Sequence, residues 1–311
     1  MFVVTYRKIF YVISAVITLV ALGAILLWGL QLGIDFKGGS LVEVSYTSAR
    51  PDINAVKASL AGVVSGGFSV RPTGNTGYIL RTPLLDEAGH AAVLQALSQK
   101  EASKMTELRF DSVGPVIGEE LRTKSTLAVG LVILAIVLFI AFVFRKVSEP
   151  VASWKYGLIA VVALLHDVIV PTGAFAILGH FVGTEVDTLF VTALLVVLGF
   201  SVHDTIVVFD RVRENLRVNK ELNKQGEPFE EIVGRSVAQT FNRSINTSLT
   251  TVLALIALYL LGSAATKDFS LALIIGIVAG TYSSIFLASP LLVTIEKWSA
   301  SARDGQKKVS K

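Results

Sequence analysis

The sequence predicts a polytopic α-helical membrane protein with six transmembrane helices and one small α+β domain between the first and second helix. Three observations support this fold class. Only 17% of the 311 residues are charged and 52% are hydrophobic, whereas about a quarter of the residues in soluble domains are charged. The apolar residues gather in long runs, which raises the mean hydropathy to +0.65. One stretch between two of these runs has the mixed pattern of a folded soluble domain.

Six apolar stretches are long enough to cross a bilayer, because a transmembrane helix needs about 20 residues at a rise of about 1.5 Å each. The first of them follows two basic residues, is too long for the apolar core of a signal peptide and lacks a clear cleavage site, so we expect a retained anchor. We expect the spans at 9–30, 126–144, 155–178, 188–210, 245–262 and 269–293.

Basic residues gather on alternate connections, which predicts that both termini are cytoplasmic. The cytoplasmic set comprises Arg7, Lys8, Arg145, Lys146, the connection 211–243 and the tail 294–311. The opposite short connections hold few basic residues. The expected parts are the N-terminus with the first span (1–30), a periplasmic domain (31–125), the bundle of the other five spans (126–293) and the basic cytoplasmic tail (294–311).

The stretch 31–125 reads as two strand–helix–strand units. Asp52 opens one helix as an N-cap residue, and Thr73 to Gly77 form a hairpin turn. The order βαββαβ predicts a ferredoxin-like sandwich of two helices on a four-stranded sheet. Strands are expected at 41–46, 68–71, 78–81 and 106–110, and helices at 52–60 and 86–99.

The connection 211–243 is charged and partly amphipathic. Its apolar residues recur at near-helical spacing, which favours a helix lying on the membrane surface before the fifth span. A polar connector with some helix explains the same pattern equally well, so both interpretations stay open.

Two acidic residues lie inside apolar spans, Asp204 in the fourth and Asp167 near the middle of the third. A carboxylate at the centre of a membrane helix costs about 2.5–3.5 kcal/mol on insertion scales, so such residues usually face a partner or a water path. The alternatives are solvation of Asp204 from the cytoplasm and a structural pairing of Asp167 with its neighbouring histidine. A proton-coupling role is the functional hypothesis for both.

Each acid follows a histidine, in His166–Asp167 and His203–Asp204. Neighbours on a helix point about 100° apart, so neither pair forms one ligand face, and no HExxH spacing is present. We therefore expect a proton relay that includes His203 and no metal site.

Arg243 stands before a polar run, 244–251, at the cytoplasmic start of the fifth span. At a depth comparable with that of Asp204, it could form an ion pair that keeps the carboxylate charged until a proton arrives. Alternatively, Arg243 is only a positive-inside anchor at the cytoplasmic end of this span. In the last span Gly276, Gly280, Ser283 and Ser284 indicate close helix packing.

Glycine clusters flank the outer domain and are predicted hinges, because glycine accepts positive φ and occupies little volume. Neither cluster matches the GxxxxGK[ST] phosphate loop, so ATP hydrolysis is not expected. The absence of cysteine excludes disulfides and thiolate chemistry, and membrane topology accounts for the basic residues without nucleic acid. The predicted hinge residues are Gly33, Gly38, Gly39, Gly114 and Gly118.

Several motifs together resemble the SecF proteins of the SecD/SecF protein-export family, and the match follows the whole chain in order. The most specific is the fourth-span run from Gly199 to Asn215. The loop before Arg243 is a little longer here than in some relatives. The other matching motifs are GIDFKGG at 33–39, VGPVIG at 113–118, the LLHDV run ending at Val168 and TYSS at 281–284.

The resemblance implies a bacterial inner-membrane subunit that pairs with SecD in a pseudo-symmetric twelve-helix bundle related to the RND transporters. It implies that the pair uses the proton gradient to help preproteins through the SecYEG translocon, with YajC and YidC as further partners. The family's membrane aspartate and functional arginine match Asp204 and Arg243. No enzyme activity and no cofactor are implied, and sodium is the alternative coupling ion. The competing functions are an RND-like small-molecule exporter subunit, an intramembrane aspartyl protease using Asp167 and Asp204, and a passive scaffold.

Overall fold

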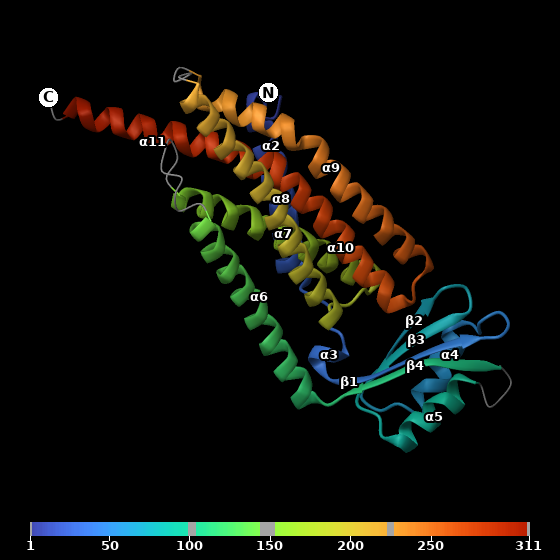
Figure 1. The fold of residues 1–311 in the computed structure, drawn as a ribbon. Helices are drawn as coiled ribbons and strands as arrows, with labels where there is room; N and C mark the ends of the chain where they lie inside the picture. The colour runs from blue at the N-terminus through green and yellow to red at the C-terminus, as the bar shows by residue number, and fades with distance from the viewer. Residues whose placement is uncertain (1, 99–103, 144–152, 223–226, 310–311) are drawn as a thin grey trace. The chain divides into compact units, whose positions relative to one another are not determined.

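A computed structural model describes residues 2–98, 104–143, 153–222 and 227–309 (Figure 1). Arg145 and Lys146, the middle of the 211–243 connection, Gln99 of the second predicted domain helix and the last two residues of the tail lie outside these ranges. The chain forms two compact units: one comprises 1–31, 128–184 and 189–311, and the other comprises 32–127 with 185–188.

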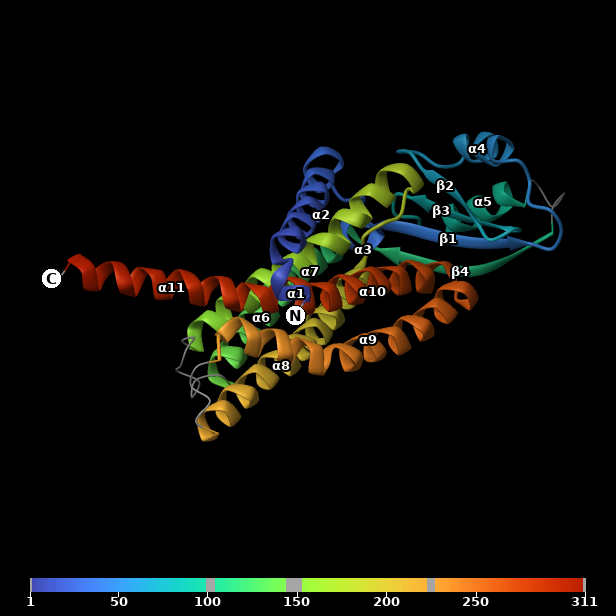
Figure 2. The same cartoon turned by 90° about the horizontal axis from the view of Figure 1, so that it is seen from above.

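The second unit contains the predicted ferredoxin-like sandwich. In the part of the chain that the structure describes, four antiparallel strands form one sheet in the order β2-β3-β1-β4. Helices α4 and α5 lie on one face of the sheet (Figure 2). The strands are β1 (Gly39–Tyr46), β2 (Ser69–Thr73), β3 (Gly77–Thr82) and β4 (Met105–Val113), and the helices are α4 (Ile53–Ala61) and α5 (Glu87–Leu97).

Both domain helices begin at aspartate N-caps. The Asp52 carboxylate accepts a hydrogen bond of 2.8 Å from the Asn54 amide, and Asp86 accepts one of 2.7 Å from the Gly89 amide. Each cap satisfies an amide that the first helical turn leaves unpaired. The core between sheet and helices holds alternate residues of β1 and one apolar face of each helix: Val42, Val44, Tyr46, Val56, Leu60, Val93 and Leu97.

Among the described residues, six helices are long and apolar enough to cross a membrane, which confirms the predicted fold class. The last span contains a π-helical segment, η1, between two α-helical parts. Two short helices, α1 (Phe2–Thr5) and α3 (Ile34–Lys37), complete the described elements. The spans are α2 (Arg7–Trp28), α6 (Pro115–Val143), α7 (Ser153–Val182), α8 (Thr188–Glu221), α9 (Phe229–Leu261) and α10 (Ala264–Tyr282) continuing through η1 (Ser283–Ala288) into α11 (Ser289–Val309).

The central helices of the bundle are α7, α8 and the last span. Half of the apolar window of α7 and of α8 and 67% of that of the last span are buried, against 6% for α6 and 17% each for α2 and α9. The exposed faces of α2 and α6, and that of α9 beyond Thr250, are mainly apolar surfaces that lipid or another membrane protein must cover.

The described residues of the 211–243 connection form the ends of two membrane helices and not a separate surface helix. Helix α8 continues to Glu221 and α9 already begins at Phe229. Polar side chains join the two ends: the Asn215 amide group donates to Ser236 Oγ at 2.8 Å and to Gln239 Oε1 at 2.9 Å. These contacts explain why charged sequence continues both helices beyond the apolar runs.

Candidate functional site

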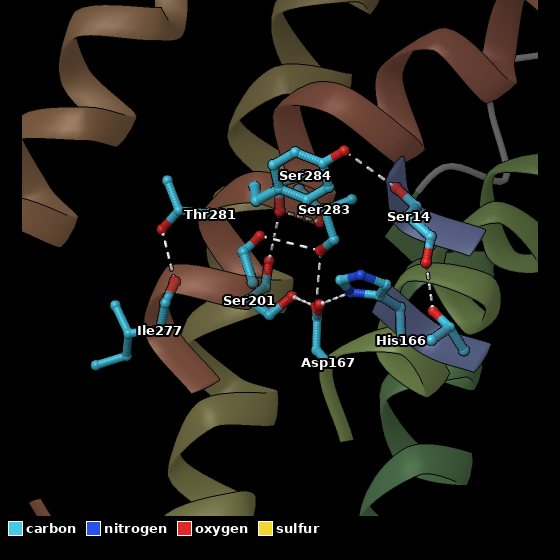
Figure 3. Close-up of polar contacts among 12 residues, drawn as sticks. Ser14, His166, Asp167, Ser201, Ile277, Thr281, Ser283 and Ser284 are labelled. Carbon is cyan, nitrogen blue, oxygen red and sulfur yellow. Dashed lines mark hydrogen bonds and ion pairs between the residues drawn. The ribbon is translucent and has the colours of Figure 1, made fainter. Parts of the chain in front are cut away.

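The carboxyl group of Asp167 on α7 is a wholly buried acidic group of the bundle, with no exposed surface. Its Oδ1 lies 2.9 Å from His166 Nδ1. Its Oδ2 accepts hydrogen bonds from the hydroxyl groups of Ser201 on α8 and Ser283 on η1, the latter at 2.8 Å. Figure 3 shows these three side chains directed at the carboxyl group from three different segments of the bundle.

Close helix packing makes this convergence possible. A Cβ atom on Gly280 would lie 2.9 Å from Ser201 Cβ, and one on Gly276 would collide with the Val197 side chain. Glycine at both positions lets α10 approach α8 closely. The expectation of close packing is therefore met at the glycines, whereas Ser283, expected only to pack, also donates a hydrogen bond to the buried acid.

The polar contacts continue along η1. Ser284 Oγ lies 2.8 Å from Thr205 Oγ1 on α8, and Ser289 Oγ donates to the Ser284 carbonyl at 2.7 Å. π-Helical segments are rare and frequently occur at functional sites. The segment begins at Ser283, the residue whose hydroxyl group reaches Asp167.

His166 is 4% exposed and lies between Asp167 and Tyr282. Its ring stacks on that of Tyr282 at a centroid distance of 6.2 Å. The Tyr282 hydroxyl donates to the Phe10 carbonyl at 3.1 Å and accepts from Ser14 at 3.3 Å. Within the described ranges, the second ring nitrogen of His166, Nε2, is buried without a hydrogen-bond partner.

Asp204 forms a second buried acidic site, in which its side chain is 5% exposed. Its Oδ1 accepts a hydrogen bond of 2.6 Å from Ser244 Oγ on α9, and its buried Oδ2 has no partner among the described residues. One turn along α9, the hydroxyl groups of Ser248 and Thr281 are hydrogen-bonded at 2.5 Å. The polar run at the start of the fifth span therefore contacts both α8 and α10.

Arg243 and His203 do not contact the Asp204 carboxyl group directly. Both side chains are exposed, and no ion pair within 4.0 Å joins Arg243 to Asp204 in the described part of the chain. The expected direct ion pair is therefore not formed in this structure, but the positive charges of both residues still act on the carboxylate, and their coupling role stays a prediction. Consecutive helical residues point about 100° apart, so the orientation that brings Ser244 to Asp204 turns Arg243 away. Arg243 is nevertheless at the expected depth, one residue from the contact.

The two histidine–aspartate pairs behave differently. His166 contacts Asp167 directly, whereas His203 is exposed and Asp204 is buried. The two carboxyl groups bind different partners, and among the described residues no hydrogen bond joins them. No group of three or more His, Cys, Asp or Glu side chains that could hold a metal ion occurs in those residues.

The glycine clusters of the second unit pack directly on each other. Gly38 and Gly39 have φ values of 77° and 127°. A Cβ on Gly38 would lie 2.8 Å from Pro115 Cα, and one on Gly118 would lie 2.9 Å from the Gly38 amide nitrogen. The Gly33 amide donates to the Val186 carbonyl at 2.9 Å, and the surroundings of Gly114 are open. The hinge role of these glycines stays a prediction.

Two family descriptions match the chain. "Protein export membrane protein SecD/SecF, C-terminal" matches residues 93–298, and "SecD/SecF GG Motif" matches residues 29–49. The chain is 46% identical over 305 residues to "Protein translocase subunit SecF" of Thermobaculum terrenum, covering 94% of this chain and 93% of the relative. It is 35% identical over 289 residues to the protein of the same name from Pseudomonas aeruginosa, covering 92% and 89%.

Solved structures give the same result. The crystal structure of SecDF from Thermus thermophilus, described as a translocon-associated membrane protein, matches with a TM-score of 0.81 at 30% identity, covering 94% of this chain and 38% of that one. SecDF in its super-membrane-facing form matches with a TM-score of 0.64 at 32% identity, covering 98% and 39%. This chain thus spans less than half of either SecDF chain. The chain belongs to the SecD/SecF family of protein export membrane proteins, in which its nearly full-length relatives are SecF subunits.

Proposed function

We propose that this chain, a multi-pass protein of the bacterial inner membrane, works with SecD as an accessory subunit that uses the proton gradient to assist preprotein translocation through SecYEG. Family membership and the likeness to a translocon-associated SecDF support the export role. Because the chain spans only 38% of that solved chain, SecD would supply the remaining part. YajC and YidC are proposed as further partners, and both termini are proposed to be cytoplasmic.

The observation that supports proton coupling is the burial of the Asp204 carboxyl group. It lies within a membrane span with the Ser244 hydroxyl as its hydrogen-bond partner among the described residues. A charged group with so little compensation is costly in a membrane interior, so binding a proton changes the free energy of this helix contact substantially. Protonation would therefore favour a different packing of α8 against α9.

The exposed side of α9 supports a membrane partner at the same depth. Arg243, Asn246 and Thr247 are exposed on a helix that spans the membrane. Lipid tails offer such groups no hydrogen bonds, so this side fits another polar protein surface. We assign this polar side of α9 to contact with SecD. Arg243 would there meet an acidic group of SecD. Arg243 could then take part in coupling without a direct bond to Asp204.

The energy available is sufficient for a conformational change. One charge that crosses a potential of 100 mV gains about 2.3 kcal/mol, before any pH gradient is added. Two conformations that differ by a few kcal/mol in free energy can therefore be interconverted when one or two charges cross the membrane. The outer domain would move during this exchange about the predicted glycine hinges, and sodium in place of the proton is the alternative coupling ion.

The test compares Asp204→Asn with wild type after co-purification with SecD and reconstitution with SecYEG. We expect the variant to assemble but to lose export driven by an imposed pH gradient. Asp210→Asn is the matched control, because Asp210 is exposed on the same helix and pairs with Arg213 at 2.8 Å. Normal late-stage translocation by Asp204→Asn would refute the proposal.

The competing functions give different results. An intramembrane aspartyl protease needs two carboxyl groups that share a proton, whereas Asp167 and Asp204 bind separate partners. Peptide cleavage lost in either Asn variant would favour it. Gradient-driven efflux of a small molecule without SecYEG would favour an exporter, and full export by both Asn variants would favour a passive scaffold.

A further inference from the structure

We propose that the Asp167 centre, formed by Asp167, His166, Ser201 and Ser283, is a second proton-binding site whose occupancy controls the π-helical segment η1. This inference rests on the proposed function, since it places another proton site in the same export subunit. The sequence suggests a proton role for both acids and the family resemblance favours Asp204, whereas the link from Asp167 to η1 follows only from the contacts around Asp167.

The first step is the charge balance of the centre. The groups that face Asp167 are His166 on its own helix, the Ser201 hydroxyl on α8 and the Ser283 hydroxyl on η1. The phenol of Tyr282 lies beyond the imidazole, and Asp204 follows Ser201 by one helical turn on α8. No lysine or arginine pairs with Asp167 among the described residues. With neutral His166 the centre carries one negative charge, and one bound proton makes it neutral overall.

That proton can be held in two ways. Either Asp167 carries it as a neutral acid, or His166 carries it and forms an ion pair across the 2.9 Å contact. A wholly buried unpaired carboxylate is far more costly than either neutral arrangement. The contact between the two side chains thus lets the centre share one proton as a unit when it is occupied.

The second step concerns the free nitrogen of His166. Nδ1 is engaged with Asp167, so a proton enters or leaves the ring at Nε2, which is buried and has no hydrogen-bond partner among the described residues. Tyr282 lies against the ring, and its hydroxyl is already hydrogen-bonded to Ser14 and Phe10 of α2. Because the side chain of His166 is only 4% exposed, Nε2 needs a transient hydrogen-bond partner when a proton enters or leaves the ring.

The third step links occupancy to η1. Ser201 and Ser283 donate to the same oxygen, Oδ2. When Oδ2 holds a proton it becomes a donor, so one of the two hydroxyl groups must turn to another acceptor. Ser283 has such an acceptor ready, because its Oγ lies 3.0 Å from the Gly280 carbonyl. The protonated Oδ2 can then donate to Ser283 Oγ. Protonation thus reverses this hydrogen bond with a rotation of one hydroxyl group and turns the link between η1 and α7 from a charge-assisted bond into a neutral one.

The fourth step is the connection to the first site. Ser284, the next residue of η1, is hydrogen-bonded to Thr205, the neighbour of Asp204 on α8. The π-helical segment is therefore held at one residue by the Asp167 centre and at the next by the turn that carries Asp204 (Figure 3 shows the Asp167 end of this arrangement). A change at η1 moves α8, and the two acids respond to each other through it.

The experiment is infrared difference spectroscopy of the purified complex with SecD, in which acid and alkaline buffer are exchanged. A protonated carboxyl group gives a C=O band, and a proton on His166 gives an imidazolium band together with the carboxylate bands of Asp167, so the probe is the proton itself in either arrangement. We expect one band to vanish in Asp167→Asn and a different band to vanish in Asp204→Asn. Ser283→Ala should shift the frequency of the Asp167 band, because it removes one of the two hydroxyl bonds to Oδ2.

Ser289→Ala is the matched control. Ser289 is a buried serine next to the same segment, but its hydroxyl donates to the Ser284 carbonyl and not to a carboxyl group. It should leave the Asp167 band unchanged. If Asp167→Asn does not assemble, Ser283→Ala and its control still decide the question. The proposal is overturned if no band depends on Asp167, or if the Ser283 and Ser289 variants give the same spectrum.

The two proposals fail differently. Loss of the Asp167 band with normal gradient-driven export by Asp204→Asn overturns the proposed function and keeps this site. Failure of export in Asp204→Asn without any Asp167-dependent band overturns the second site alone.

Discussion

The Ser244 hydroxyl donates a hydrogen bond of 2.6 Å to Asp204 Oδ1 and so joins α9 to α8 at a buried acidic group. Ser244→Ala removes this bond and leaves the carboxyl group without a hydrogen-bond partner among the described residues. We expect a loss of about 1–3 kcal/mol in the free energy of unfolding, the usual cost of an unsatisfied buried polar group. Denaturant unfolding of the purified complex measures it.

A double-mutant cycle with Asp204→Ala is the control. If Ser244 acts through Asp204, the two substitutions are not additive, because each alone already removes one partner of the hydrogen bond. Additive losses would show that Ser244 contributes through packing and not through this hydrogen bond.

Gly276 should not tolerate a side chain. A Cβ there would collide with Val197, which is 1% exposed on α8. Gly276→Ala is expected to cost about 1–3 kcal/mol of stability, the range for overpacking in a core, and Val197→Ala in the same chain should restore part of it. Gly130→Ala is the control on α6, since nothing lies within 4 Å of its Cβ position. Equal thermal stability of both alanine variants would contradict the close approach of α10 to α8.

Alanine substitutions at Gly38 and Gly67 test whether Gly38 is needed for close packing or only for its backbone conformation. Gly38 and Gly67 both have positive φ, 77° and 91°. Alanine at either position is therefore strained, at a cost of about 1–3 kcal/mol for such sparsely populated backbone conformations. Only Gly38 also meets backbone, with its Cβ position 2.8 Å from Pro115 Cα, whereas the Gly67 position is open. We expect Gly38→Ala to lower the thermal unfolding temperature clearly more than Gly67→Ala, and equal shifts would refute the packing argument.

The sequence predicted best those features that depend on local composition. Long apolar runs predicted all six spans, and the aspartates at 52 and 86 begin the two domain helices as N-caps. These features follow from neighbours in the sequence: a span needs only enough apolar residues, and a cap needs only an acceptor before the first turn. The βαββαβ order then left few topologies, because strand–helix–strand connections have a preferred right hand and do not cross each other, and of the consecutive strands in the described ranges only β2 and β3 pair directly.

Features that depend on tertiary contacts were predicted less well. The ends of α8 and α9 in the 211–243 connection are held by polar contacts between the helices, such as that of Asn215 with Ser236, which periodicity does not reveal. Ser201 and Ser283 are ordinary serines in apolar sequence, and only the arrangement of three segments brings them to Asp167. The rotation of α9 likewise decided that Ser244, and not Arg243, meets Asp204.

Glu43 gives the outer domain a pH-dependent stability. It lies on the central strand β1 and is 8% exposed. Burial raises the pKa of its carboxyl group, and the charge of Arg109 on the paired strand partly opposes this. The folded state therefore holds the proton more tightly than the unfolded state, so this contribution to stability is complete at acid pH and is lost as the pH rises through the raised pKa.

Glu43→Gln keeps the shape of the side chain and removes the titration. We expect the variant to lose less stability than wild type between the ordinary pKa range of glutamate and neutral pH, because no charge has to be buried. Thermal unfolding of the full chain at several pH values measures this. Glu107→Gln is the control on the edge strand β4, where the carboxylate contacts His90 at 2.9 Å. A steeper pH dependence in Glu43→Gln would contradict the sign of the shift.

Asn215 should hold the C-terminal end of α8 and the N-terminal end of α9 in register. Its side chain is 8% exposed and donates to both Ser236 and Gln239, and Arg211 Nε donates to the same Gln239 oxygen at 2.7 Å. Asn215→Ala leaves these acceptors with fewer donors, so the first turns of α9 should open more often. We expect faster amide hydrogen exchange over 229–240, by roughly tenfold for about 1.4 kcal/mol lost.

The strands of the outer domain provide an internal control for that measurement, since their exchange depends on the sheet and not on this helix pair. The same helices carry the contact between Asp204 and Ser244 two to three turns further into the membrane. If the polar contacts of Asn215 set the register there as well, Asn215→Ala also alters the Asp204 infrared band although the residue does not touch the acid. Unchanged exchange together with an unchanged band would show that apolar packing alone sets the register of α8 and α9.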